Sequence, residues 1–185
     1  MIRSKSDYIN YRKQDGTFNR QLKEVFFDDI SHFKIILRKT EYYENSGKGF
    51  IGKVVSYFYK ARLKYCSRRL GFSIPRNVFG PGLSIPHCGT IIVSSAARVG
   101  SNCRLHVCVV IAASSGSSQV PKIGNNVYIG PGAKIFGDIE IADGIAIGAN
   151  SVVNRSFLQP GITIAGVPAK QIGEGGSVGA GWNPI

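Results

Sequence analysis

The chain has 185 residues, of which 43% are hydrophobic and 18% are charged, and its formal net charge is +12. This length predicts one domain with a smaller addition, and no run of about 20 apolar residues occurs, so a membrane-spanning segment is not expected. The first residues lack the apolar stretch of a secretory signal, and we therefore expect a cytoplasmic protein.

The positive charge is concentrated in residues 1–70, which contain 16 Lys or Arg against 7 Asp or Glu. Such an excess of positive charge is typical of proteins that bind nucleic acid, a membrane surface or an anionic cofactor. No recognised DNA- or RNA-binding motif accompanies the charge, so nucleic acid is not expected to bind. No C-x-x-C pair and no histidine cluster accompanies the four cysteines, which predicts reduced thiols and no metal site: Cys66, Cys88, Cys103 and Cys108.

Two helices are expected in this basic region, after a polar and irregular stretch over residues 1–20. Apolar residues recur at three- and four-residue spacing over residues 22–43, which predicts an amphipathic helix. A second helix is predicted over residues 50–70, with an apolar side opposite a basic one. The basic side is either the solvated surface of a helix that caps the next domain, or a patch that attracts an anionic membrane surface or a lipid-linked phosphorylated substrate. The apolar side contains Phe50, Ile51, Val54, Val55, Phe58 and Leu63.

From residue 71 the chain changes to a repeat with a period of six. A helical stripe would need a period of 3.6 and a two-sided strand a period of two, whereas six residues make one short strand and one corner. Three such units close one coil of a parallel β-helix, which we predict over residues 71–157. The alternative is a β-sandwich, whose strands would recur at roughly 8 to 12 residues. The clearest aliphatic positions are Ile123, Ile129, Ile135, Ile141, Ile147 and Val153.

The repeat is irregular at two places and ends in a different segment. Extending its frame backwards would bury His87 without a partner, so we predict a two-residue slip that turns Ile85 inward and His87 outward. Residues 112–121 are rich in serine and are predicted to form a loop thrown out from a corner, the alternative being a disordered linker. Residues 158–185 form a C-terminal segment with a glycine-rich tail that we expect to be flexible, with Trp182 free to dock on a neighbour.

Four sequence strings carry a resemblance to a known family. They are PGLSIPH at residues 81–87, PKIG at 121–124, IGPGAKIFG at 129–137 and AGVPAK at 165–170. Over about residues 71–173 the chain resembles the serine acetyltransferase branch of the hexapeptide-repeat acyltransferases. The resemblance implies a left-handed parallel β-helix, a homotrimer, and acetyl-CoA as co-substrate in the groove between adjacent solenoids. The left hand comes only from the resemblance, because the general crossover rule predicts the opposite hand.

The resemblance also implies roles for particular residues. The histidine that matches His87 is the general base that takes the proton from the acceptor hydroxyl, a role that suits an imidazole because it titrates near neutrality. His106 lies about one coil later, and adjacent coils are about 4.8 Å apart. We predict that it either lines the acceptor pocket or fills a surface groove. On the donor side, the resemblance places small residues along the pantetheine arm and a lysine near the nucleotide phosphates: Pro131, Ala149 and Thr163, then Lys170.

The chain departs from this family where serine acetyltransferases hold their amino acid. Instead of a carboxylate before the catalytic histidine, a second acid directly preceding it and an Arg-His pair, this chain has Phe72 or Ser73, Pro86 and the pair at residues 119–120. No Asp or Glu occurs between Glu44 and Asp138. A backbone carbonyl, a hydroxyl or a neighbouring subunit must then orient His87. Loss of the charged contacts argues against free serine as the acceptor.

We therefore predict an acetyl-CoA-dependent O-acetyltransferase that modifies a saccharide hydroxyl. The acceptor would be a nucleotide- or lipid-linked precursor of capsular or other surface polysaccharide, because short chains of this kind resemble the O-acetyltransferases that decorate such polymers. The first alternative is a serine O-acetyltransferase of cysteine biosynthesis. The second is a non-catalytic solenoid that scaffolds partners through its basic helices.

Overall fold

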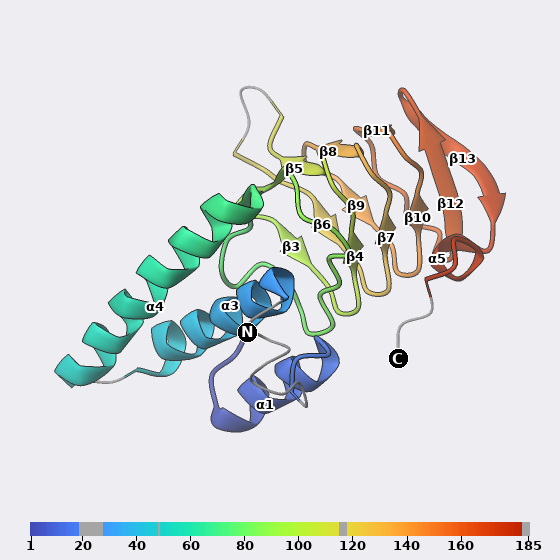
Figure 1. Cartoon of the computed structure of the whole chain (residues 1–185). Coiled ribbons are helices and arrows are strands. Elements are labelled where there is room, and N and C mark those ends of the chain that lie inside the picture. The colour runs from blue at the N-terminus through green and yellow to red at the C-terminus, as the bar shows by residue number, and fades with distance from the viewer. Residues whose placement is uncertain (19–27, 48, 115–117, 183–185) are drawn as a thin grey trace.

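The computed structural model describes residues 1–18, 28–47, 49–114 and 118–182. Its body is a parallel β-helix with three faces, and helices cover the end where the solenoid begins (Figure 1). The first face contains β1 (Phe72–Ser73), β2 (Ile91–Val93), β5 (Val110–Ala112), β8 (Lys134–Phe136) and β11 (Val152–Val153). The second contains β4 (Arg104–Leu105), β7 (Tyr128–Ile129), β10 (Ala146–Ile147) and β12 (Ile162–Gly166), with β13 (Ala169–Glu174) antiparallel at its edge. The third contains β3 (Arg98–Val99), β6 (Lys122–Ile123) and β9 (Glu140–Ile141).

The six-residue period has the structural cause that the sequence indicates. Each short strand turns one aliphatic side chain into the solenoid, and the same position of the next coil stacks directly upon it, as Ile111 pairs with Ile135 and Ile129 with Ile147. These four side chains are fully buried. Burying such a side chain stabilises the fold by roughly 1.5 to 3 kcal/mol, so the stack supplies the core.

The structure confirms the slip in the first coil. Ser84 bridges Arg104, 20 residues further on, whereas Lys134 pairs with Val152 after 18 residues, the length of a regular coil. Ile85 is consequently buried and His87 is exposed.

The second irregularity is also where the sequence predicts it. Val110 pairs with Lys134, which is 24 residues further on, so one coil contains six residues more than a regular one. The extra residues lie between β5 and β6, where Figure 1 shows the chain leaving the solenoid. The predicted loop over 112–121 includes residues 115–117, which lie outside the described residues.

The N-terminal region contains α1 (Lys5–Gln14), α3 (Asp29–Ser46) and α4 (Gly49–Leu70). Residues 1–20 were expected to be irregular, and α1 contradicts this. Its signal in the sequence is a capping box, in which the Ser4 side chain accepts from Asp7 N and the Asp7 carboxylate accepts from Ser4 N. α3 confirms the first expected helix, of which residues 22–27 lie outside the described residues. α4 ends at Leu70, where Gly71 adopts a left-handed φ of 77°.

The packing of α4 differs from the prediction. Of the side predicted to be apolar, Leu63 is buried, whereas Phe50, Ile51, Val54 and Phe58 are all exposed. The helix instead packs on α3 and β1 through a narrow seam that contains Ser56, Leu63 and Leu70. These residues recur every seven positions, which keeps them on one line along the helix.

The C-terminal segment is more ordered than expected. After the β12–β13 hairpin the chain forms a short turn of helix, α5 (Gly176–Gly179), which packs against β10 and β12. The Trp182 indole N–H then donates to Asn102 O of the same chain at 2.9 Å. The described part of the tail is therefore docked on its own solenoid.

Candidate active site

His87 lies at an outer corner of the first coil, held by backbone hydrogen bonds on both sides. Ser84 N donates to Cys103 O at 3.0 Å, and Gly89 N donates to Leu70 O at 3.0 Å. Among the residues that the structure describes, none forms a hydrogen bond with the His87 side chain. The corner is thus fixed in position, and neither ring nitrogen has a hydrogen-bond partner within the described residues.

The approach to His87 is also fixed by a buried carboxylate from the helical region. Asp15 follows α1, and its Oδ1 accepts hydrogen bonds from Gly82 N at 2.8 Å and from Leu83 N at 3.0 Å. Hydrogen bonds to a charged group are stronger than those between neutral groups. The helical region therefore positions the segment that leads into the candidate base.

Asp15 is part of a buried ionic cluster around Arg38 of α3. Arg38 Nε lies 2.8 Å from Asp15 Oδ2 and its Nη1 lies 3.0 Å from Glu41 Oε2. The same guanidinium donates to Phe79 O at 3.0 Å and to Gly80 O at 2.7 Å. Burial lowers the pKa of Arg38, but the two carboxylates outweigh it and raise that pKa above its usual value. Arg38 is therefore a permanent cation that links α3 to the first coil.

His106 lies on the next coil, beside His87. Leu105 N donates to Ser84 O at 2.9 Å, which places the two histidine-bearing corners in adjacent coils. Burial lowers the pKa of His106, and the nearby Arg104 and His87 lower it further. Its ring packs at 5.0 Å from the Tyr128 ring, and its Nε2 is buried without a hydrogen-bond partner in the described chain. A neutral imidazole with an unpartnered nitrogen is suited to bind a polar substrate group.

Arg104 completes this group of side chains. It lies two residues before His106, on the same outer face of β4, because Leu105 between them points inward. Its guanidinium carbon lies 5.1 Å from the centre of the Trp182 ring, a cation–π contact. Its Nε is buried without a partner, and Arg104 forms no ion pair within the described residues. Among the residues described by the structure, the face beside His87 therefore carries a cation and no carboxylate.

Two of the predicted donor-side residues follow the same corner in later coils. Gly132 N donates to Val107 O at 2.9 Å and Asn150 N donates to Pro131 O at 2.8 Å, so the corners that begin at residues 107, 131 and 149 are stacked. Pro131 and Ala149 are both exposed there. The stack continues from the corner of His87 and offers a surface with small side chains.

The other two predicted donor-side residues lie at the far end of the solenoid. Thr163 pairs with Ala146 between β12 and β10, and Lys170 pairs with Ala165 in the β12–β13 hairpin. Lys170 is exposed. The structure thus places Thr163 and Lys170 on the second face, several coils away from His87.

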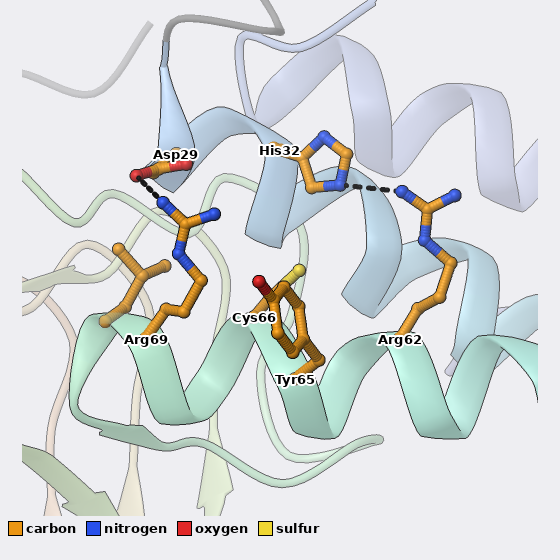
Figure 2. Close-up of a pocket in the computed structure, with 7 residues that line it drawn as sticks. Asp29, His32, Arg62, Tyr65, Cys66 and Arg69 are labelled. Carbon is orange, nitrogen blue, oxygen red and sulfur yellow. Dashed lines mark hydrogen bonds and ion pairs between the residues drawn. The ribbon is translucent and has the colours of Figure 1, made fainter.

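A separate pocket of about 220 Å³ lies between α3 and α4 (Figure 2). In it His32 Nε2 lies 3.2 Å from Arg62 Nη2, and Arg69 Nη2 lies 3.4 Å from Asp29 Oδ2. Burial, followed by the charge of Arg62, lowers the pKa of His32, and burial raises the pKa of the Cys66 thiol. A protonated thiol is a poor nucleophile, so the pocket offers no evident thiol catalysis.

Two negative findings apply to residues 1–18, 28–47, 49–114 and 118–182. In these ranges no group of three His, Cys, Asp or Glu side chains is placed to hold a metal ion. In the same ranges no helix combines the length and the apolar character needed to cross a bilayer.

Comparison with known proteins identifies the solenoid. Residues 121–155 match the family described as bacterial transferase hexapeptide (six repeats). A serine acetyltransferase from Escherichia coli strain K12 is 37% identical over 102 residues, which are 54% of this chain and 37% of that protein. One from Synechococcus elongatus is 31% identical over 131 residues, which are 65% of this chain and 53% of that protein. The chain therefore spans less than two thirds of the length of these relatives.

The similarity extends to solved structures. The serine acetyltransferase of Brucella abortus strain S19, in complex with coenzyme A, superposes with a TM-score of 0.69 at 28% identity, and the match covers 92% of this chain and 66% of that chain. The chain carries the bacterial transferase hexapeptide repeat and is similar to the serine acetyltransferase branch in sequence and in structure. Its β-helix is consequently left-handed, as the sequence resemblance implies and against the general crossover rule.

The positions at which this chain differs in sequence from serine acetyltransferases also lack the acidic groups of that branch in the structure. Phe72 is buried and packs edge-on against Phe33, with ring centres 5.1 Å apart, so it belongs to the core. Pro86 directly precedes the candidate base, where serine acetyltransferases have an acid, and its side chain is uncharged. Of the carboxylates that reach the first coil, Asp15 and Glu41 bind backbone N–H groups and Arg38, and Glu44 binds Arg76.

Arg104 and Tyr128 were not predicted from the sequence as members of the site, and the position of Trp182 differs from the one expected. Arg104 had a readable signal, because it alternates with the inward Leu105 and so shares the outer face of His106. Tyr128 lies opposite Arg104 in the next coil, but the six-residue insertion hides this register. Trp182 was expected in a flexible tail from which it could dock on a neighbour, and nothing in the sequence links it to Asn102 of its own chain, 80 residues earlier.

Proposed function

We propose that this protein is an acetyl-CoA-dependent O-acetyltransferase with His87 as the general base. The observation that carries the proposal is the exposed His87 at a rigid corner, followed by a stack of small-residue corners at Pro131 and Ala149. The names of the relatives and the coenzyme A complex of one of them support the same chemistry. Within that branch the resemblance also supports a homotrimer.

His87 would remove the proton from the acceptor hydroxyl while the oxygen attacks the acetyl carbonyl. Acetyl-CoA, the second substrate, supplies the acetyl group as a thioester, and the CoA thiol leaves. General base catalysis of this kind contributes roughly a factor of 10² to 10⁴ to the rate. His106 and Arg104 would hold the acceptor beside the base, because both lie on the outer face of the adjacent coil and each has a nitrogen without a hydrogen-bond partner in the described chain.

The names of the relatives support L-serine as the acceptor. On that assignment Arg104 would bind the serine carboxylate, since a guanidinium pairs readily with a carboxylate. The saccharide acceptor expected from the sequence receives no support from the comparisons. It stays the second candidate because of one observation: no carboxylate among the described residues is free beside His87 to bind the ammonium group of an amino acid.

The acceptor can be assigned by following release of the CoA thiol. The full chain is incubated with acetyl-CoA and with L-serine, O-methylserine, neutral hexoses or hexuronic acids, and the products are identified by mass spectrometry. Turnover with L-serine but not with O-methylserine, which lacks the hydroxyl, supports the first assignment, and turnover with sugars alone supports the second. Absence of transfer to every acceptor, together with no acetyl-CoA binding in calorimetry, would favour the non-catalytic scaffold.

A further inference from the structure

Helix α4 has two apolar sides, and only one of them is packed. The narrow seam of Ser56, Leu63 and Leu70 faces α3 and the first coil. The opposite side presents aliphatic and aromatic residues at three- and four-residue spacing, and each is more than half exposed. Figure 1 shows α4 running along the outside of the helical region, its first turns reaching beyond the solenoid. The exposed apolar side consists of Phe50, Ile51, Val54, Tyr57, Phe58 and Tyr65.

Basic residues border this exposed side, and acidic residues are absent from α4. The helix contains six Lys or Arg and no Asp or Glu. At 3.6 residues per turn, Lys53 and Lys64 lie along one border of the apolar side and Arg62 and Arg69 along the other. Within the described residues, Lys53 and Lys64 have no ion-pair partner. Arg62 and Arg69 face His32 and Asp29 across the pocket shown in Figure 2, so this border is also rich in cations.

We propose that α4 lies with this side on a membrane surface that contains anionic phospholipid. An amphipathic helix with apolar residues between basic borders buries its apolar side about 5–10 Å into the boundary between headgroups and acyl chains. Tyrosine suits this depth because its ring is apolar and its hydroxyl stays wet. Each Lys or Arg near an anionic leaflet contributes about 1 kcal/mol, roughly a fivefold gain in affinity.

Charge favours a lipid surface over a two-fold contact of this side with a second copy of the chain. A two-fold contact places the same patch of both partners together. On α4 such a contact would bring Lys53, Lys64 and Arg68 of one copy close to those of the other, with no acidic residue on either helix to compensate. An anionic lipid surface covers the same apolar side and neutralises the same cations.

The test is co-sedimentation of the full chain with vesicles of phosphatidylcholine alone or mixed with phosphatidylserine. We expect binding to the mixed vesicles to be at least about tenfold tighter, and to weaken at high salt because screening acts on the charged borders. The double variant Val54→Ser, Phe58→Ser should bind mixed vesicles more than about tenfold more weakly than the parent chain. The double variant Lys53→Gln, Lys64→Gln should bind them roughly 25-fold more weakly. Leu158→Ser, at an equally exposed position on the solenoid, should bind like the parent chain.

Two results would overturn the proposal. The first is equal binding to vesicles with and without phosphatidylserine, or no binding to either. The second is a change of oligomeric state in the Val54→Ser, Phe58→Ser variant without lipid, which would assign this side of α4 to contacts between copies. Circular dichroism and thermal melting establish that each variant is folded. Neither result depends on acetyl transfer, so the proposal stands or falls apart from the proposed function.

Discussion

At the scale of single residues, adjacent histidines have different surroundings. His87 is exposed and makes no hydrogen bond within the described chain, whereas His106 is partly covered by Tyr128 and lies close to Arg104. The sequence was sufficient to turn His87 outward, because an unpartnered imidazole is costly inside an aliphatic stack. The contact of Arg104 with Trp182 could not be predicted from the sequence, since cation–π pairs between distant segments leave no periodic signal.

The lowered pKa of His106 predicts a stability that depends on pH. The folded chain holds His106 neutral, while the unfolded chain takes up a proton as the pH falls through about 6.5, so acid favours unfolding. Replacing His106→Gln should therefore reduce the loss of unfolding free energy between pH 7.5 and 5.5. The measurement is urea denaturation of both proteins at the two pH values. His32, whose pKa is also lowered, keeps part of the pH dependence in both. An identical pH dependence in both proteins would contradict the assignment.

At the scale of elements, the solenoid was predictable and the helical region only partly so. A period of six has few structural solutions, so the strands followed from the spacing of Ile123 to Val153. A helix that is apolar on two sides does not reveal which side packs, and α4 packs through the seam containing Leu63 rather than through Phe58. The ionic link between α3 and the first coil was also hidden, because Arg38, Asp15 and Glu41 look like surface charges in the sequence.

The Arg38 cluster predicts a large loss of stability when the cation is removed. Arg38→Met leaves the buried carboxylates of Asp15 and Glu41 uncompensated, which should lower the free energy of unfolding by about 3–5 kcal/mol. Urea denaturation checks this at fixed protein concentration. The matched control is Arg3→Met, because Arg3 is exposed and should change stability by less than about 0.5 kcal/mol. Equal effects of the two substitutions would show that the cluster does not anchor the first coil.

Strand β2 offers a matched pair for the core. Ile91 is 0% exposed and Ile92 is 44% exposed, although they are adjacent and chemically identical. Ile91→Ala should cost about 2–5 kcal/mol, since it leaves a cavity in the aliphatic stack, and Ile92→Ala less than about 1 kcal/mol. Thermal and urea unfolding of both variants would measure the difference. A larger cost at Ile92 than at Ile91 would mean that the register of the first coils is wrong.

At the scale of the whole molecule, a solenoid that resembles serine acetyltransferases is joined to a helical region with an exposed apolar side. The proposed homotrimer predicts a mass of 60 kDa without lipid, three times the 20.0 kDa of one chain. Light scattering coupled to size-exclusion chromatography measures it. A stable mass of one chain at micromolar concentration would contradict the trimer, and with it a donor groove between adjacent solenoids.

The most direct test of the central claim compares His87→Ala with the parent chain in transfer from acetyl-CoA to the identified acceptor. We predict that turnover falls by at least about 100-fold while calorimetry shows unchanged binding of acetyl-CoA, because the variant lacks only the base. Thr90→Ala is the control, since Thr90 is exposed three residues after His87 and has no proposed role in the reaction. Turnover of His87→Ala equal to that of the parent chain would contradict the account.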